Sequence, residues 1–354
     1  MTVEKMKVYQ SSLYQKQIHL AAKSIPHMRK TILVTGATGM IGSSLVDVLL
    51  SSNSLDENEL TVLALGRNRR KLEERFAYAQ GRIDLRLLIQ DIMEPLDGRQ
   101  DIDYIIHAAS NADPVSYAVH PTETLLTNIY GTNNMLMYCK SHASTRILLT
   151  STFEVYGKKE EKDIYCEDDS GEVDLNQIRS CYPESKRSSE ILLRCYHKQY
   201  GVDGVMARLC SIYGPTMSEK DSKAHAQFIR NALAGQEIVL KSRGQQKRTY
   251  CYLMDAMTGI LTVLFHGQSG EAYNIANEEG VTSIAGLADT VASICGTKIR
   301  YDLPDEVEKQ GFSRPQNCIL DNTKLRSLGW KGQYSLRDGL GSTLNILRET
   351  VIEA

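Results

Sequence analysis

A glycine-rich segment near the start of the chain limits the fold more than any other feature. The apolar residues 32–34 lead into Thr35-Gly36-Ala37-Thr38-Gly39-Met40-Ile41-Gly42, and apolar residues then recur at helical spacing to residue 50. This pattern predicts a strand, a tight turn and a helix. In such a turn the first glycine makes the bend, the second lets a pyrophosphate approach the backbone, and the third allows close helix packing. We therefore expect a dinucleotide site formed by Gly36, Thr38, Gly39, Met40, Ile41 and Gly42.

The rest of the chain continues this rhythm and predicts an α/β fold. Short apolar runs at 60–65, 85–89, 104–107, 147–150 and 204–209 alternate with helix-like stretches, which is typical of a parallel sheet buried on both faces. We expect a Rossmann-type, doubly wound parallel sheet with a smaller C-terminal substrate-binding α/β lobe. The predicted divisions are an N-terminal extension at 1–29, the dinucleotide domain at 30–215 with 246–275 returning to it, and the lobe at 216–245 and 276–354.

Composition narrows the class of protein further. The 354 residues are 42% hydrophobic and 24% charged with a formal net charge of −2, which gives no support to nucleic-acid binding. No apolar run is long enough for a membrane helix or a signal peptide, so we expect a cytoplasmic protein that does not contact membranes. The eight cysteines include no C-x-x-C pair, which predicts reduced thiols and no metal site.

A second motif carries the chemistry. Tyr182 and Lys186 are four residues apart, so a helix would place the phenol and the ammonium on one face, where the cation would lower the phenol pKa. Tyr182 would then take the proton from a sugar hydroxyl while a hydride leaves for a nicotinamide. Thr152 and Glu154 follow a buried strand, at the sheet edge where ligands bind. Thr152 would bind the reacting hydroxyl, and Glu154 is either an acid–base group or a solvent-facing loop residue.

The residues at the end of the second strand do not decide between NAD and NADP. The acid that usually binds the adenosine ribose is replaced by Gly66, and Arg67 and Asn68 follow. We expect NAD, with NADP as an alternative because Arg67 and the basic residues after it suit a ribose phosphate.

Over residues 31–330 the chain resembles the extended short-chain dehydrogenase/reductases, in particular their nucleotide-sugar epimerases, dehydratases and decarboxylases. The resemblance rests on residues 35–42, 91–92, 107–110, 128–132 and 213–215, together with Thr152, Tyr182, Lys186 and Arg208. It implies further cofactor contacts from Asp91, Ile92, Ala108, Ala109, Ser110, Asn128, Thr150 and Arg208, as well as from Tyr182 and Lys186.

Residues 179–187, Arg-Ser-Cys-Tyr-Pro-Glu-Ser-Lys-Arg, are most similar to the signature of UDP-glucuronate decarboxylases. The likeness implies oxidation at the sugar C4, loss of the C5 carboxylate and reduction by the same retained cofactor. Departures bear on the substrate. Phe153 stands where 4,6-dehydratases have an acid and decarboxylases a serine, Ser211 replaces an asparagine, and residues 242–244 replace a Gly-Asp-Gly turn.

The same resemblance implies the remaining contacts and partners. A nucleotide-diphosphate sugar would be held by Arg179, Ser211, Arg248 and Arg314, although a structural salt bridge explains Arg179 equally well and an exposed loop position suits Arg314. Relatives dimerise through two helices, here around 115–140 and 181–200, so we expect a homodimer.

Alternative functions are a nucleotide-sugar 4-epimerase, a 4,6-dehydratase and an NADP-dependent 4-keto-sugar reductase. The alternative of another class is a non-catalytic dinucleotide sensor or scaffold.

Overall fold

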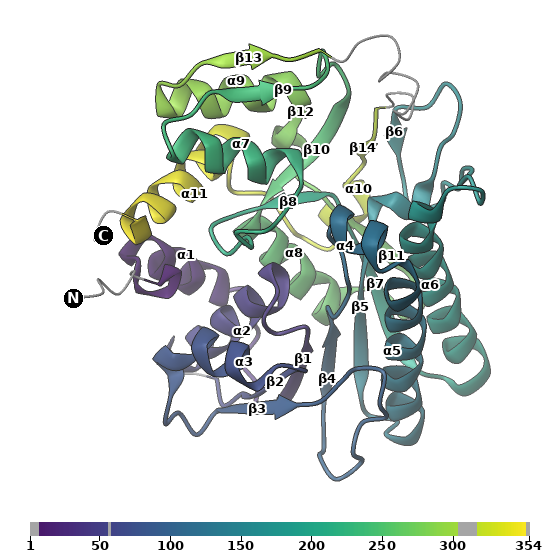
Figure 1. Ribbon diagram of the computed structural model, residues 1–354. Helices are drawn as coiled ribbons and strands as arrows, with labels where there is room; N and C mark the ends of the chain where they lie inside the picture. The colour runs from purple at the N-terminus through teal and green to yellow at the C-terminus, as the bar shows by residue number, and fades with distance from the viewer. Residues whose placement is uncertain (1–6, 56–57, 304–316, 352–354) are drawn as a thin grey trace.

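Seven parallel strands form the central sheet of the computed structural model, which describes residues 7–55, 58–303 and 317–351 (Figure 1). The strand order is β3-β2-β1-β4-β5-β7-β11, and every pairing between neighbours is parallel. The strands are β1 (Thr31–Thr35), β2 (Thr61–Gly66), β3 (Leu85–Ile89), β4 (Tyr104–His107), β5 (Arg146–Thr152), β7 (Asp203–Leu209) and β11 (Ala272–Ile275). The predicted Rossmann-type sheet is confirmed.

Helices cover both faces of this sheet and separate its apolar residues into two cores. Within β1, Ile32 and Val34 join one core with helices α2 (Met40–Ser52) and α8 (Leu253–His266), whereas Leu33 joins the other with α5 (Pro121–Ser141) and α6 (Cys181–Tyr200). Alternate side chains of a strand point to opposite faces, so burial on both faces requires the continuous apolar runs seen in the sequence. Helices α3 (Arg69–Arg75) and α4 (Pro114–Val119) complete this region.

A smaller α/β lobe lies beside the carboxyl ends of the strands (Figure 1). Its three-stranded sheet contains β8 (Ser211–Tyr213), β10 (Lys247–Tyr252) and β12 (Val281–Ser283), and two-stranded pairs join β9 (Ile238–Leu240) to β13 (Ile299–Tyr301) and β6 (Ile164–Tyr165) to β14 (Ile319–Leu320). Its helices are α7 (Ala224–Leu233), α9 (Ile284–Cys295), α10 (Thr323–Arg326) and α11 (Leu336–Val351).

The segment expected to return to the main sheet divides between the two parts. Strand β11 lies at the edge of the seven-stranded sheet and α8 packs on its face, but β10 pairs with β8 and β12 in the lobe. Two short strands of distant segments, β6 and β14, also pair. The chain therefore passes several times between the dinucleotide domain and the lobe.

The N-terminal extension contains a docked helix, α1 (Ser12–Ala22), which packs on α2, α8 and α11. Tyr14 is fully buried, and its hydroxyl donates to Asp47 of α2 at 2.7 Å. The same carboxylate accepts from Tyr78 at 2.5 Å and forms an ion pair with Arg75. Within the described residues, no helix has the length and apolarity needed to cross a bilayer.

We predict that Tyr14→Phe lowers the free energy of unfolding by about 1–2 kcal/mol, because a buried carboxylate loses one of its donors. Chemical denaturation measures this change. Tyr301→Phe is the matched control, since Tyr301 is half exposed on β13. Equal effects of the two substitutions would show that the Asp47 network does not anchor α1.

Candidate functional site

The turn after β1 brings its backbone against the end of β4. Gly36 has φ +66°, and a Cβ atom there would lie 2.8 Å from the carbonyl oxygen of Ala108. The Thr35 hydroxyl accepts hydrogen bonds from the amides of Ala108 and Ala109, both at 3.1 Å. Only glycine combines this backbone conformation with so close an approach.

The side chain of His107 also stabilises the contact between the β1 turn and the end of β4. Its Nδ1 lies 2.9 Å from the Thr35 hydroxyl oxygen, which already accepts two amide hydrogens and so donates its own proton to the ring. Burial, with a smaller contribution from the Lys186 ammonium, lowers the pKa of His107 to about 3. The histidine is therefore neutral at physiological pH and acts as an acceptor.

An open cavity of about 740 Å³ lies beside this turn, at the ends of β2 and β3. Its lining includes Thr38, Arg67, Asn68 and Asp91, which were predicted to bind the cofactor, and Lys71, which belongs to the basic residues expected to suit a ribose phosphate. Three further lining residues were not predicted, namely Ile89, Gln90 and Glu94. Asn68 also caps α3 by accepting from the amide of Lys71. The predicted residues Met40 and Ile41 begin α2. Ile92 is buried and does not line the cavity, and its carbonyl accepts from Asn134.

The polar groups of this region fit a dinucleotide. Ser110 Oγ and Asn128 Oδ1 are buried without a hydrogen-bond partner in the described part of the chain, and Asn128 Nδ2 donates to Ser185 at 2.8 Å. Buried polar atoms are normally paired, so unpaired ones beside a glycine turn indicate groups that a ligand satisfies. Gly42 lets the start of α2 pack directly on the turn, because a Cβ atom there would lie 2.3 Å from the carbonyl oxygen of Gly36.

The predicted catalytic residues converge at the end of β5. Lys186 of α6 donates to the carbonyl of Thr150 at 3.0 Å, and the Thr150 hydroxyl donates to the His107 carbonyl, also at 3.0 Å. Tyr182, one turn earlier on α6, lies near Thr152, whose hydroxyl acts to lower the pKa of the phenol. All of these side chains are less than a tenth exposed. A buried phenol, hydroxyl and ammonium thus meet at the sheet edge.

Burial shifts the two titrating groups of this cluster in opposite directions. It lowers the pKa of Lys186 to about 8, although the Glu190 charge opposes the shift. The pKa of Tyr182 is raised, first by burial and then by the charge of Glu154. The predicted lowering of the Tyr182 pKa is therefore wrong for the protein without ligands, because loss of hydration is the largest influence on this phenol.

Glu154 is paired rather than solvent-facing. Arg179 donates to the Glu154 carboxylate at 2.9 Å. In the protein without ligands, Arg179 therefore forms a salt bridge, which was the alternative to substrate binding. Sequence reasoning missed Tyr117, whose ring stacks on Tyr182 with centroids 5.2 Å apart and whose hydroxyl accepts from Arg179 at 3.4 Å. Burial and Glu154 raise the pKa of Tyr117 to about 12. Its position three residues into a short proline-initiated helix gave no sequence signal.

The remaining predicted residues lie in three different places. Ser211 and Arg248 are on adjacent strands of the lobe, β8 and β10, and the Arg248 guanidinium lies 5.4 Å from the Phe153 ring centroid. Arg314 lies outside the described residues. Arg208 is not free to bind a cofactor, contrary to prediction, because its nitrogens donate to Glu190 and to a backbone carbonyl. All eight cysteines are unpaired, and the described residues contain no group of metal ligands.

The chain is similar in sequence and in fold to known proteins. The NAD dependent epimerase/dehydratase family matches residues 32–276. UDP-glucuronic acid decarboxylase 3 of Arabidopsis thaliana is 35% identical over 89% of this chain and 87% of its own length, and UDP-glucuronic acid decarboxylase 1 of Xenopus tropicalis is 33% identical over 91% and 73%. The NAD-bound structure of dTDP-glucose 4,6-dehydratase from Streptomyces venezuelae superposes with a TM-score of 0.76, at 28% identity over 90% of this chain and 97% of that one. The chain therefore belongs to the NAD dependent epimerase/dehydratase family.

Proposed function

We propose that the protein decarboxylates a UDP-linked hexuronic acid, most similarly to UDP-glucuronate decarboxylase. The observation that carries the proposal is the buried cluster of Tyr182, Thr152 and Lys186 with the Glu154–Arg179 pair at its edge. Curated relatives with that activity cover nearly the whole chain. Phe153 supplies no proton for dehydration, which favours decarboxylation over the 4,6-dehydratase alternative.

The chain's own residues account for the proton movements. Bound NAD supplies the hydride acceptor at C4 and a positive charge that favours the ionised phenol. Tyr182 takes the proton of the C4 hydroxyl, which Thr152 orients, while the Lys186 ammonium stabilises the phenolate. Breaking the bond from C5 to its carboxylate then releases carbon dioxide and leaves its electrons on the C4 ketone. A proton taken up from solvent at C5, together with return of the hydride to C4 and of the Tyr182 proton to the C4 oxygen, would complete a cycle without net redox change.

Arg179 suits the carboxylate that is lost. Its guanidinium is about half exposed and already holds one carboxylate, that of Glu154, in the ligand-free protein. A planar guanidinium has donors for two acceptors, so the substrate carboxylate can share it. Such a pairing would hold the uronic acid beside Tyr182.

We predict that mass spectrometry of a panel of UDP-, dTDP-, GDP- and CDP-linked sugars and uronic acids shows loss of carbon dioxide from a UDP-hexuronic acid. Tyr182→Phe should reduce this turnover by about 100-fold or more, because it removes the acid–base group. The matched control is Tyr200→Phe, on the exposed end of the same helix.

Unchanged turnover in Tyr182→Phe would sink the mechanism. Unchanged substrate mass with altered stereochemistry would identify an epimerase, and loss of water a dehydratase. A net absorbance change of the nicotinamide would identify a reductase, and dinucleotide binding without any turnover would identify a sensor.

We propose NAD as the cofactor. Arg67 and Lys71 line the cavity without an ion pair in the described part of the chain and by themselves would suit a ribose phosphate, whereas Arg69 and Arg70 are neutralised by Glu73 and Glu74. Asp91 and Glu94 line the same cavity and would repel a ribose phosphate. A carboxylate at position 66 would crowd the side chain of Leu72, which lies 3.3 Å from the Cβ position of Gly66.

Calorimetric titration should show tighter binding of NAD than of NADP, and Gly36→Ala should abolish binding of both. Gly81→Ala is the matched control, because Gly81 also has a positive φ but no atom within 4 Å of its Cβ position. Both variants carry the strain of an alanine at positive φ, about 1–2 kcal/mol, and only Gly36→Ala adds the clash with Ala108. Retained affinity in Gly36→Ala would place the dinucleotide elsewhere, and tighter NADP binding would reverse the cofactor assignment.

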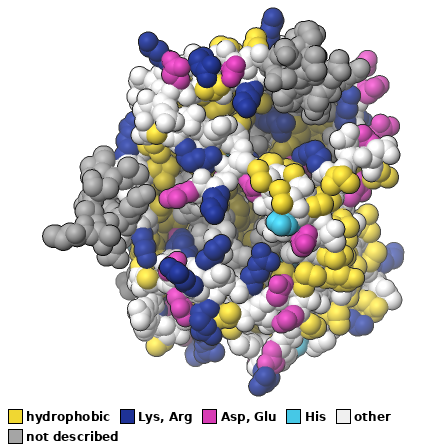
Figure 2. Space-filling model, viewed as in Figure 1, with side chains coloured by type: hydrophobic (Ala, Val, Ile, Leu, Met, Phe, Trp, Pro, Cys, Tyr) yellow, Lys and Arg dark blue, Asp and Glu magenta, His cyan; other side chains and the backbone are white. Residues whose placement is uncertain are grey.

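We also propose a homodimer formed through α5 and α6. Tyr130 and Met137 are exposed on α5, and Ile191 is 60% exposed on α6, which packs beside it. Figure 2 shows apolar side chains gathered on the side of the molecule where α5 lies. Exposed apolar surface of this kind is typical of an interface.

Light scattering should give the mass of two chains for the native protein and of one chain for Met137→Glu combined with Ile191→Glu, because the charges would be buried at the interface. Ile83→Glu, at a residue 94% exposed outside these helices, should stay dimeric. A dimer that survives the double substitution would exclude this interface.

A further inference from the structure

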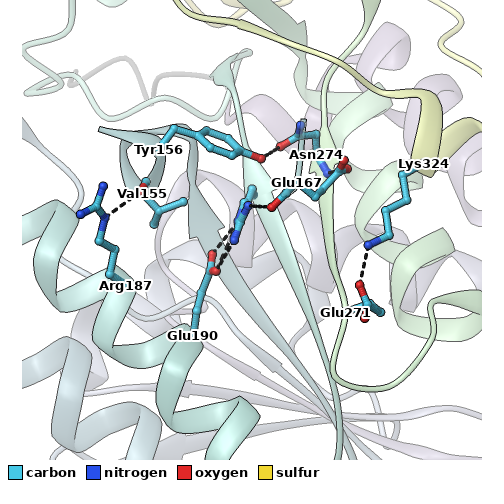
Figure 3. Close-up of polar contacts among 9 residues, drawn as sticks. Val155, Tyr156, Glu167, Arg187, Glu190, Glu271, Asn274 and Lys324 are labelled. Atoms are coloured by element: carbon cyan, nitrogen blue, oxygen red, sulfur yellow. Dashed lines mark hydrogen bonds and ion pairs between the residues drawn. The ribbon is translucent and has the colours of Figure 1, made fainter. Parts of the chain in front are cut away.

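The proposed reactive groups come from two separate segments of the chain. One of these segments also contains a buried tyrosine, Tyr156, which is hydrogen-bonded to a residue outside the site. Thr152 and Glu154 flank the start of the turn η4 (Phe153–Tyr156), whereas Tyr182 and Lys186 are on α6. Tyr156 ends this turn, is fully buried and donates from its hydroxyl to Asn274 at 2.6 Å (Figure 3). The turn is thereby tied to β11, at the edge of the main sheet.

Asn274 is a fixed partner for this hydroxyl. Its side-chain Nδ2 donates to the carbonyls of Tyr165 and Asp321 at 3.1 and 2.9 Å. Its backbone amide donates to the Glu167 carboxylate at 2.7 Å. Both side-chain hydrogens are used, so the oxygen must face Tyr156. The side chain is fully buried and has no alternative partner in water.

Arg208 of β7 connects this turn to α6. Its guanidinium carbon lies 4.9 Å from the Tyr156 ring centroid, while Nη2 and Nε donate to Glu190 at 2.7 and 3.0 Å. Nη1 donates to the Glu167 carbonyl at 2.7 Å. Glu190 is one helical turn beyond Lys186, and Figure 3 shows its carboxylate directed away from α6 toward this network.

We infer that Arg208 is a positioning residue, which with Tyr156 and Glu190 fixes the helix carrying Tyr182 and Lys186 relative to the turn carrying Thr152 and Glu154. One rigid guanidinium contacts both segments, and it is 8% exposed. A buried ion pair cannot separate without leaving unpaired charge, so the spacing of the two segments is stiff. The inference rests on the proposed function and replaces the predicted contact of Arg208 with the cofactor.

Two graded substitutions test this role. Tyr156→Phe keeps the ring beside Arg208 and removes only the hydrogen bond to Asn274, whereas Arg208→Lys keeps the charge and loses the planar fork. Misplacement of reacting groups by about 1 Å can cost about 100-fold in rate. We expect kcat to fall about tenfold in Tyr156→Phe and further in Arg208→Lys, with KM for the UDP-hexuronic acid and Kd for NAD within about twofold of the native values.

Lys324→Met is the matched control. It breaks the neighbouring pair of Lys324 with Glu271, 2.6 Å apart and drawn in the same view (Figure 3). Among the described residues, no hydrogen bond or ion pair joins the side chains of this pair to η4 or α6. This variant should keep the native kcat. The inference is overturned if Tyr156→Phe keeps the native kcat, if KM and the NAD Kd deteriorate as much as kcat, or if the control loses as much activity.

Hydrogen exchange separates failure of this inference from failure of the proposed function. If the native protein turns over no sugar of the panel, the function fails alone. Amide exchange in residues 152–157 should still accelerate about tenfold or more in Tyr156→Phe and stay native in Lys324→Met, since loss of the Asn274 bond loosens the turn. Unchanged exchange in Tyr156→Phe would then overturn the positioning role.

Discussion

The close approach of the β1 turn to the end of β4 is the constraint on which the site depends. The Thr35 hydroxyl is shared between His107 and the amides of Ala108 and Ala109, so the ends of two neighbouring strands are held in register. Gly36 allows the approach because it has no side chain. The His107 carbonyl then accepts from Thr150, whose own carbonyl accepts from Lys186. A chain of hydrogen bonds thus runs from the glycine turn to the Lys186 ammonium.

Burial of charge is the second determinant of the site. Lys186 loses hydration in the interior, which lowers its pKa, and Glu190 one turn away opposes this loss. Glu190 is itself neutralised by Arg208, so the cost of burying three charges is shared within one network. At the substrate side, Arg179 does the same for Glu154. The phenol of Tyr182 is buried as well, and this burial together with the charge of Glu154 raises its pKa.

The N-terminal helix α1 is attached to the rest of the protein by polar contacts as well as by apolar packing. Helix α1 buries Tyr14 against Asp47, and Gln17 accepts from Tyr252 of the lobe at 2.5 Å. The first helix of the chain therefore contacts both the dinucleotide domain and the lobe. Its loosely periodic sequence gave no indication of this position, because buried polar contacts leave no hydrophobic pattern.

The sequence by itself determined the parallel α/β fold, the glycine turn and the grouping of Thr152, Tyr182 and Lys186, because these depend on local spacing and on where strands end. Only the tertiary structure decided what Arg208, Tyr117 and Tyr156 do. Their partners are distant in sequence, and an arginine that binds a phosphate cannot be told by spacing from one that binds Glu190. The direction of the Tyr182 pKa shift was likewise set by burial, which depends on how the whole chain packs around the phenol.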